Sequence, residues 1–353
     1  MKAMILAGGT GGHVFPALAV AQRLRELGHE VFWMGTQAGL EARVVPAHGI
    51  EVEWIRVAGL RGKGMLSLLT APLAVGRALI QALAVVRRRK PNVVLGMGGY
   101  VAGPGGLASW LMRQPLVIHE QNAAPGTTNR ILARFARRVL QAFPGSIRNG
   151  VTVGNPVRAG FAAVPAPAQR LAGRDGAIRV LVLGGSQGAR ALNERVPQAL
   201  AQMSAERRPQ VWHQAGRTLE VAEQSYREAN VEARLDAFIE DMPAAYAWAD
   251  LVLCRSGAMT VAELAAAGCA SLLVPFPFAT DDHQTRNGEY LVGAGAAEMI
   301  AESALTPERL ADSLSALTAD REVLLRMSEA ARAAAWPRAL DVIVSTLLQE
   351  ARK

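Results

Sequence analysis

The sequence has few aromatic residues and few cysteines, and these shortages exclude several classes of protein. Aromatic side chains make up 5% of the 353 residues, and none alternates with the clusters of basic residues. Proteins that bind single-stranded nucleic acid use such rings for stacking, so we expect no nucleic acid partner. The two cysteines, Cys254 and Cys269, lack the spacing of metal ligands and indicate reduced thiols in a cytosolic protein.

Sequence patterns for common cofactors and for a leader peptide are also missing. The G-x-G-x-x-G pattern of dinucleotide-binding proteins fails because the sixth residue counted from Gly9 is Val14. The Walker pattern fails because Gly62 and Lys63 are followed by glycine. The opening segment MKAMILAGG is too short for the apolar core of a signal peptide and predicts a first strand. We therefore expect neither a bound NAD nor a P-loop nucleotide, and no cofactor.

The overall composition favours two globular domains with an anionic partner. A length of 353 residues, half of them apolar, provides two ordinary cores. The formal charge of +8 and the isoelectric point near 10.1 are typical of proteins that meet phosphorylated substrates or anionic lipid. A general enrichment in arginine explains the same charge without any partner.

Two glycine-rich turns are the most informative feature that is present. ILAGGTGGH has glycines at 8, 9, 11 and 12, and VLGGSQGAR has them at 184, 185 and 188. Each follows an apolar run and precedes a segment with helical spacing. Such a turn directs backbone N–H groups and the positive end of a helix dipole at one point, which suits a phosphate. Tight packing alone is the alternative explanation for a single turn.

The pattern along the chain predicts an α/β protein with two Rossmann-like domains facing across a cleft. Short apolar runs alternate with helical segments, which is typical of a parallel sheet covered on both faces. The Ala-, Pro- and Gly-rich segment 159–177 is expected to be a linker, after which the pattern starts again. We expect domains at residues 1–157 and 158–336, and the pattern leaves open where the amphipathic segment Leu340–Leu348 packs. The expected strands are Met4–Ala7, Val31–Met34, Val93–Gly96, Leu116–His119, Arg138–Gln141, Arg179–Leu183, Val211–Gln214, Ala233–Phe238, Leu251–Cys254 and Ser271–Val274.

Polar groups at the ends of these strands suggest a reaction site. His13 lies where the first turn becomes a helix, where the dipole favours a neutral imidazole that can accept a proton. Glu263 lies one turn into a helix that follows a Ser-Gly turn, so its carboxylate can accept hydrogen bonds from a ribose diol. A histidine that only caps the turn and an ordinary surface glutamate are the alternatives. Asp281 and Asp282 invite a metal, but the D-x-D spacing is absent, and we expect none.

An apolar segment with basic flanks suggests contact with a membrane surface. Met65–Val86 contains a single charged residue, Arg77, and is flanked by Arg61, Lys63 and the run 87–90. Pro72 and the central arginine disfavour a transmembrane span. A helix of this kind can lie on an anionic leaflet, whereas a buried crossover helix accounts equally well for most of its apolar residues.

Seven segments, in order from residue 4 to about residue 300, resemble the MurG family of bacterial glycosyltransferases. The resemblance implies the B-type glycosyltransferase fold, with a terminal helix in 337–353 packing on the first domain. It also implies an inverting, metal-independent transfer of N-acetylglucosamine from UDP-N-acetylglucosamine to undecaprenyl-pyrophosphoryl-N-acetylmuramoyl pentapeptide. It further implies a role in peptidoglycan synthesis at the cytoplasmic face of the bacterial plasma membrane. The segments are GGTGGHVFPALAVA, GGYVAGP, HEQNAAPGTTN, GNPVR, GGSQGAR, RSGAMTVAE and PFPFATDDHQTRNGEYL.

The resemblance also implies which residues bind the donor, and His13 is our choice of catalytic base. Two other enzymes stay open from the residues alone: a UDP-sugar epimerase, favoured by the HEQN and DDHQ groups, and a transferase for another lipid or natural-product acceptor. The implied donor contacts are Thr10, Gly11, Gly12, Asn122, Arg158, Ser186, Ile239, Ala258, Met259, Thr260, Val261, Ala262, Glu263 and Gln284.

Overall fold

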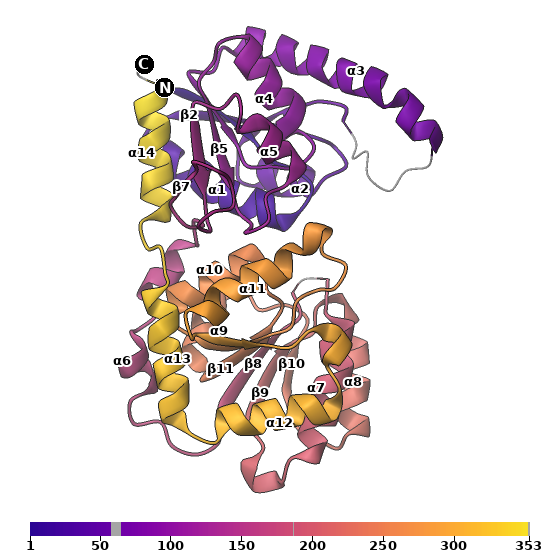
Figure 1. The fold of residues 1–353 in the computed structure, drawn as a ribbon, viewed down its shortest axis with the longest axis vertical. Helices are drawn as coiled ribbons and strands as arrows, with labels where there is room; N and C mark the ends of the chain where they lie inside the picture. The colour runs from indigo at the N-terminus through magenta and orange to yellow at the C-terminus, as the bar shows by residue number, and fades with distance from the viewer. Residues whose placement is uncertain (58–64, 186, 352–353) are drawn as a thin grey trace. The chain divides into compact units, whose positions relative to one another are not determined.

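The computed structural model describes residues 1–57, 65–185 and 187–351, and it forms two compact units. Unit 1 contains Met1–Val157 and Arg338–Lys353, and unit 2 contains Arg158–Pro337. Each unit is a parallel sheet with helices packed against it, which confirms the expected α/β class (Figure 1). The chain therefore begins and ends in the same unit.

Unit 1 has a seven-stranded sheet in the order β3-β2-β1-β4-β5-β6-β7, with every pair parallel. The chain order reverses between β1 and β4, and ligands of open α/β sheets bind beyond the carboxyl ends of strands at such a point. The strands are β1 (Lys2–Leu6), β2 (Glu30–Gly35), β3 (Glu51–Trp54), β4 (Val93–Gly96), β5 (Leu116–Glu120), β6 (Arg138–Gln141) and β7 (Val151–Thr152).

Two apolar clusters cover the two faces of this sheet because side chains alternate along each strand. Ile5 and Trp33 belong to one cluster, and Met4 and Phe32 to the other. The last helix contributes Leu347, which is fully buried, to the first cluster. The helices of unit 1 are α1 (Gly11–Glu26), α2 (Glu41–Ala47), α3 (Met65–Arg89), α4 (Ala102–Leu111), α5 (Thr127–Leu132) and α14 (Ala339–Ala351).

Unit 2 repeats the plan with six parallel strands in the order β10-β9-β8-β11-β12-β13. Its order again reverses at the centre of the sheet, between β8 and β11. The strands are β8 (Arg179–Leu183), β9 (Gln210–Gln214), β10 (Arg234–Asp236), β11 (Leu251–Cys254), β12 (Ala270–Leu273) and β13 (Ala297–Met299).

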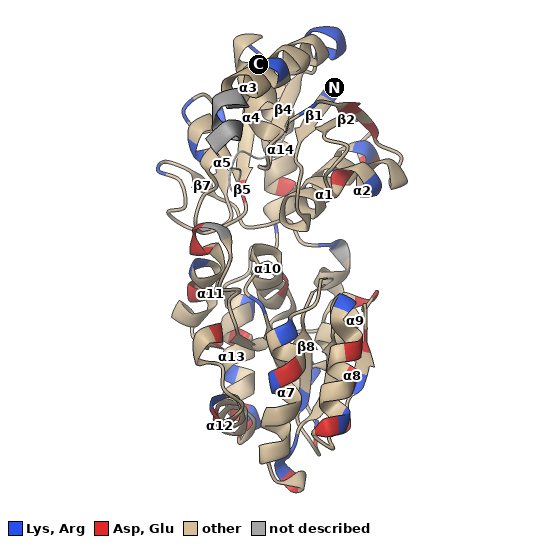
Figure 2. Cartoon of the chain, turned by 90° about the vertical axis from the view of Figure 1, so that its right-hand side faces the viewer, with Lys and Arg blue, Asp and Glu red and all other residues tan. Residues whose placement is uncertain are grey.

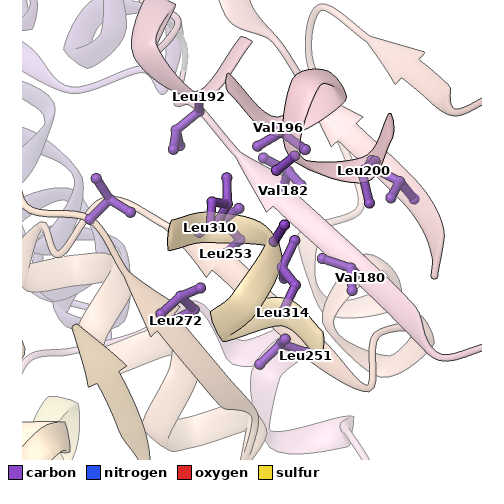
Figure 3. Close-up of a cluster of buried hydrophobic side chains, with 14 of the residues drawn as sticks. Val180, Val182, Leu192, Val196, Leu200, Leu251, Leu253, Leu272, Leu310 and Leu314 are labelled. Atoms are coloured by element: carbon purple, nitrogen blue, oxygen red, sulfur yellow. The ribbon is translucent and has the colours of Figure 1, made fainter. Parts of the chain in front are cut away.

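An apolar cluster in unit 2 packs the central strands against several helices, two of which appear in Figure 3. Val182 and Leu253 point from the sheet toward Val196 of α7 and Leu310 of α12. Charged residues occupy the outer helices α7, α8 and α12 in Figure 2, whereas β8 has a single charged residue, Arg179, at its start. The helices are α6 (Pro167–Leu171), α7 (Arg190–Gln202), α8 (Leu219–Glu228), α9 (Met242–Trp248), α10 (Ala258–Ala267), α11 (His283–Gly293), α12 (Pro307–Thr318) and α13 (Arg321–Ala333).

The expectation of a linker at 159–177 is wrong, because this segment is packed into unit 2. Phe161 is fully buried, and its ring lies edge-on to Tyr246 with 5.2 Å between the centroids. Arg170 is buried as well, and its guanidinium donates to the Ala249 carbonyl at 2.5 Å. The composition favoured a linker, but the Phe161 ring and the Arg170 guanidinium hold the segment against the rest of unit 2.

The long helix α3 has one buried and one exposed side. Ala78, Ala82 and Val85 are buried, whereas Leu73 is 75% exposed and Ile80 is 67% exposed. Among the residues that the structure describes, no helix combines the length and the apolar character needed to cross a bilayer. The expected flanking residues Arg61 and Lys63 lie outside the described residues.

Candidate functional site

The first glycine turn joins β1 to α1 in unit 1. Gly9 has φ = 90°, a conformation that glycine adopts without strain, and α1 begins at Gly11 with Thr10 as its N-cap residue. His13 lies in the first turn of the helix, as expected, with its Nδ1 atom 3.5 Å from the Thr10 hydroxyl. Thr10, Gly11, Gly12 and His13 are thus four consecutive residues at the start of one helix.

A second glycine pair, after β4, packs directly against this turn. A Cβ atom at Gly99 would lie 2.3 Å from the carbonyl oxygen of Gly8, and one at Gly98 would lie 3.0 Å from His13 Nε2. Gly98 also has φ = 94° and Gly99 φ = 82°, values that disfavour any other residue. The segment GMGGY therefore allows the His13 ring to lie against backbone.

The segment after β5 is organised by Glu120, which is 1% exposed. Its carboxylate accepts hydrogen bonds from the backbone N–H of Asn122 at 2.9 Å and from the Asn129 side chain at 2.9 Å. Burial raises the pKa of Glu120, and these donors oppose that rise. The Asn129 amide also lies 3.6 Å from the Cβ position of Gly98. Contacts therefore run from the Asn122 loop to the loop beside His13.

His119 has a structural role in the same segment. Burial lowers its pKa to about 4, so the imidazole is neutral near pH 7. Its Nε2 atom lies 2.9 Å from the Gly154 carbonyl, which attaches the GNPVR segment to the end of β5. His119 is fully buried and is therefore a poor candidate for proton exchange with a substrate.

The second glycine turn follows β8 in unit 2 and contacts a further loop. A Cβ atom at Gly216 would lie 2.3 Å from the Gly188 nitrogen, so only glycine permits this approach of the two backbones. The buried Asn193 side chain donates to the Ala215 carbonyl at 3.1 Å and to the Thr218 hydroxyl at 2.8 Å. Ser186, an expected donor contact, lies outside the described residues.

The segment Ala258–Glu263 forms the start of α10, as the Ser-Gly turn indicated. Gly257 is the N-cap residue, and the Val261 N–H donates to its carbonyl at 2.9 Å. The other expected donor contacts of this segment, Met259, Thr260 and Ala262, lie in the same first turns of α10. The first N–H groups of such a helix point out of its end, where an anion is stabilised.

Glu263 forms an ion pair with Arg158, whose guanidinium nitrogen lies 3.2 Å from its carboxylate. The Glu263 side chain is 12% exposed and that of Arg158 is 57% exposed. Burial raises the pKa of the Glu263 carboxyl, and the arginine opposes that rise. Two expected contacts that are 105 residues apart in sequence are therefore adjacent.

The remaining expected contacts flank α10. Ile239 is buried in the segment between β10 and α9. The side-chain amide oxygen of Gln284 accepts a hydrogen bond from the Phe276 N–H at 2.9 Å, which connects the start of α11 to the loop after β12. Asp281 and Asp282 both have positive φ, and the described residues include no group of three metal-ligating side chains around them.

Each unit thus gathers its expected residues at the carboxyl edge of its own sheet. In unit 1 they follow β1 and β5, and among the described residues of unit 2 they follow β10, β11 and β12. Arg158 precedes β8 and joins this group through its ion pair with Glu263. Unit 1 offers an imidazole beside backbone, and unit 2 offers a helix start and a carboxylate paired with arginine. Sequence reasoning missed the side chains that brace these loops, which are Glu41, Glu120, Asn129 and Asn193.

Comparison with known proteins shows similarity over nearly the whole chain. The glycosyltransferase family 28 N-terminal domain matches residues 3–141, and the C-terminal domain of that family matches residues 179–343. A protein from Nitrosococcus oceani named UDP-N-acetylglucosamine--N-acetylmuramyl-(pentapeptide) pyrophosphoryl-undecaprenol N-acetylglucosamine transferase is 57% identical over 336 residues, covering 94% of each chain. A protein of the same name from Alkalilimnicola ehrlichii is 55% identical, covering 100% of this chain and 99% of the relative. The crystal structure of Acinetobacter baumannii MurG superposes with a TM-score of 0.89 at 40% identity, covering 99% of both chains.

The packing of Gly98 against His13 generates a prediction about stability and ring position. Gly98→Ala is expected to cost about 1–2 kcal/mol from positive φ and a further 1–3 kcal/mol from overpacking against the imidazole. Gly145→Ala is the matched control, since Gly145 has φ = 78° and no heavy atom within 4 Å of its Cβ position. Denaturant unfolding and the NMR shifts of the His13 ring provide the measurements. Equal costs in the two variants, with unmoved ring shifts, would contradict the described contact.

Proposed function

Because this chain belongs to glycosyltransferase family 28, we propose that it transfers N-acetylglucosamine from UDP-N-acetylglucosamine to the 4-hydroxyl of undecaprenyl-pyrophosphoryl-N-acetylmuramoyl pentapeptide. The observation that carries the proposal is the 57% identity to a relative named for this reaction, over 94% of both chains. The two Rossmann-like units of the B-type glycosyltransferase fold agree with it. The product is a disaccharide precursor of peptidoglycan, which connects the enzyme with wall growth, cell shape and division.

Unit 2 binds the UDP portion of the donor in this proposal. The N-terminus of α10 and the turn containing Ser186 provide N–H groups for the diphosphate, and Ile239 borders the uracil. Glu263 accepts hydrogen bonds from the ribose hydroxyls. Its present partner Arg158 then lies beside the same donor and adds positive charge near the phosphates.

The remaining assigned contacts concern the sugar. Gln284, Asn122 and the turn Thr10–Gly12 contact the N-acetylglucosamine. The Gln284 oxygen is engaged by the Phe276 N–H, so its side-chain NH2 group is the part that is oriented for a sugar hydroxyl. No divalent cation takes part in the proposed site.

The reaction is a single displacement with inversion at the anomeric carbon. The acceptor oxygen forms a bond to this carbon from the face opposite the UDP, and the bond from the carbon to the phosphate oxygen breaks with its electrons leaving on UDP. His13 accepts the hydroxyl proton as the new bond forms. The charge that develops on UDP is stabilised by backbone dipoles that are fixed in position before the reaction.

Incubation with labelled UDP-N-acetylglucosamine and the lipid-linked muramoyl acceptor tests this function. We expect labelled disaccharide-lipid and free UDP, formed only when both substrates are present. Conversion of the UDP-sugar without an acceptor would favour the epimerase instead. Transfer to a different lipid or natural-product alcohol, with none to the muramoyl lipid, would favour the related transferase.

The assignment of His13 predicts a selective loss of turnover. His13→Ala is expected to lower kcat by about 10²–10⁴-fold, because proton removal by a positioned base contributes that much. The KM for UDP-N-acetylglucosamine should change little. His48→Ala removes an exposed histidine of the same unit and serves as the control. Unaltered turnover in the His13 variant would remove this residue from the role of base.

We further propose that the exposed side of α3 holds the enzyme on the anionic cytoplasmic leaflet, where the acceptor is anchored. Leu73, Arg77 and Ile80 are spaced so that they share one side of the helix, and all three are exposed. The positive charge at the C-terminal end of α3 is partly neutralised by ion pairs with β3. Arg88 pairs with Glu53 at 2.5 Å, and Arg89 pairs with Glu51 at 2.6 Å.

Vesicle binding tests the role of α3. Replacing Leu73 and Ile80 together by serine should weaken binding to vesicles containing phosphatidylglycerol by roughly tenfold, because apolar area no longer enters the interface. Val151→Ser is the control, since Val151 is a 57% exposed residue elsewhere on unit 1. Sedimentation with vesicles gives the affinity. Equal binding of all three proteins would contradict this surface.

A further inference from the structure

A buried carboxylate, Glu41, lies directly behind the first glycine turn. It is the first residue of α2 and is fully buried. One of its oxygens accepts the Gly9 N–H at 2.9 Å, and the other accepts the Thr36 N–H at 3.0 Å and the Thr36 hydroxyl at 2.8 Å. No described lysine, arginine or histidine forms an ion pair with it.

The surrounding backbone leaves space for this side chain. A Cβ atom at Gly39 would lie 2.0 Å from a Glu41 carboxylate oxygen, and one at Gly8 would lie 2.6 Å from the other. A Cβ atom at Gly35 would lie 3.0 Å from Glu41 Cγ. Three glycines from two loops and one strand end therefore enclose the side chain.

The backbone N–H groups of Gly9 and Thr36 each donate to a different oxygen of Glu41, so both side-chain atoms must be hydrogen-bond acceptors. A backbone N–H can only donate, so the groups from Gly9 and Thr36 each need a carboxylate oxygen. A buried ionisable group without a cation is costly, and hydrogen bonds to all of its oxygens are what make it tolerable. Glutamine cannot replace it without setting an NH2 group against one of the N–H groups.

The position of the Gly9 N–H also limits what the first turn can do. This group points at Glu41 and is not directed at a ligand, and a carboxylate close behind the turn disfavours a phosphate in front of it. The turn instead fixes the start of α1. Gly9 is followed at once by Thr10, whose carbonyl accepts the His13 N–H at 3.1 Å.

We propose that Glu41 is a positioning residue that holds the Gly9–Thr10 turn, and through it His13, in the geometry needed for proton transfer. The inference rests on the proposed role of His13 as the base. Glu41 acts from behind the turn and touches neither substrate. Because most of the assigned donor contacts lie in unit 2, it is expected to affect the rate of the chemical step more than the affinity for the donor.

A double-mutant cycle tests this inference. Glu41→Gln alone should lower kcat about 10–100-fold, since a shift near 1 Å in a reacting group has an effect of that size. The KM for UDP-N-acetylglucosamine should stay within about twofold. In the His13→Ala background, the same substitution should lower kcat by less than about threefold, because residues that act through one another are not additive.

Glu350→Gln provides the matched control. Glu350 is equally buried, lies in the same unit on α14, and pairs with Arg138 at 2.8 Å. Its replacement should lower the melting temperature, and any loss of kcat should be the same with or without His13. Glu41→Gln should instead lose kcat in the wild-type background at temperatures where circular dichroism shows a folded protein.

The outcomes separate the two proposals. If His13→Ala keeps full turnover, the proposed base is wrong, whatever Glu41 does. If His13→Ala loses turnover and Glu41→Gln lowers kcat by the same factor in both backgrounds, Glu41 is only a structural residue and the inference is overturned. A large rise in the KM for the donor with unchanged kcat would overturn it as well.

Discussion

In each unit, the candidate binding residues depend on a close approach of two backbone segments at the carboxyl ends of the central strands. Gly99 approaches Gly8 in unit 1, and Gly216 approaches Gly188 in unit 2, each so closely that a Cβ atom would lie 2.3 Å from a backbone atom. A side chain at Gly99 or Gly216 would therefore force the two loops of its unit apart. Buried acceptors and donors then fix the loops that the glycines allow, such as Glu41 on Gly9 and Asn193 on Ala215.

Much of the fold could be predicted, because fully buried parallel strands give apolar runs that are visible in the sequence. Val93–Gly96 and Leu251–Cys254 are observed with the predicted bounds. The missed strands lie at the sheet edges or close to them, as with β3, where Glu51 and Glu53 interrupt the apolar pattern. Helix α1 runs from Gly11 to Glu26 and contains Pro16, although an interior proline removes one helical hydrogen bond and usually disfavours a continuous helix.

Site residues could be predicted only where the local sequence by itself determines the local backbone structure. A glycine turn before a helix placed His13 and the start of α10 correctly, since both follow from local sequence. The bracing residues could not be found in this way. Glu41 reaches a turn 32 residues earlier, and its role depends on which loops the sheet order makes adjacent. The 159–177 segment was predicted wrongly for the same reason, because its composition gave no sign of the contacts that Phe161 and Arg170 make within unit 2.

The return of α14 to unit 1 has a consequence for how the chain can be rearranged. Strand β1 and helix α14 both belong to unit 1, so unit 2 is an insertion within the sequence of unit 1. A circular permutant that joins the present ends and opens between Val157 and Arg158 would make each unit one uninterrupted stretch of chain. The two halves would then be separable by cutting a single peptide connection, between Pro337 and Arg338.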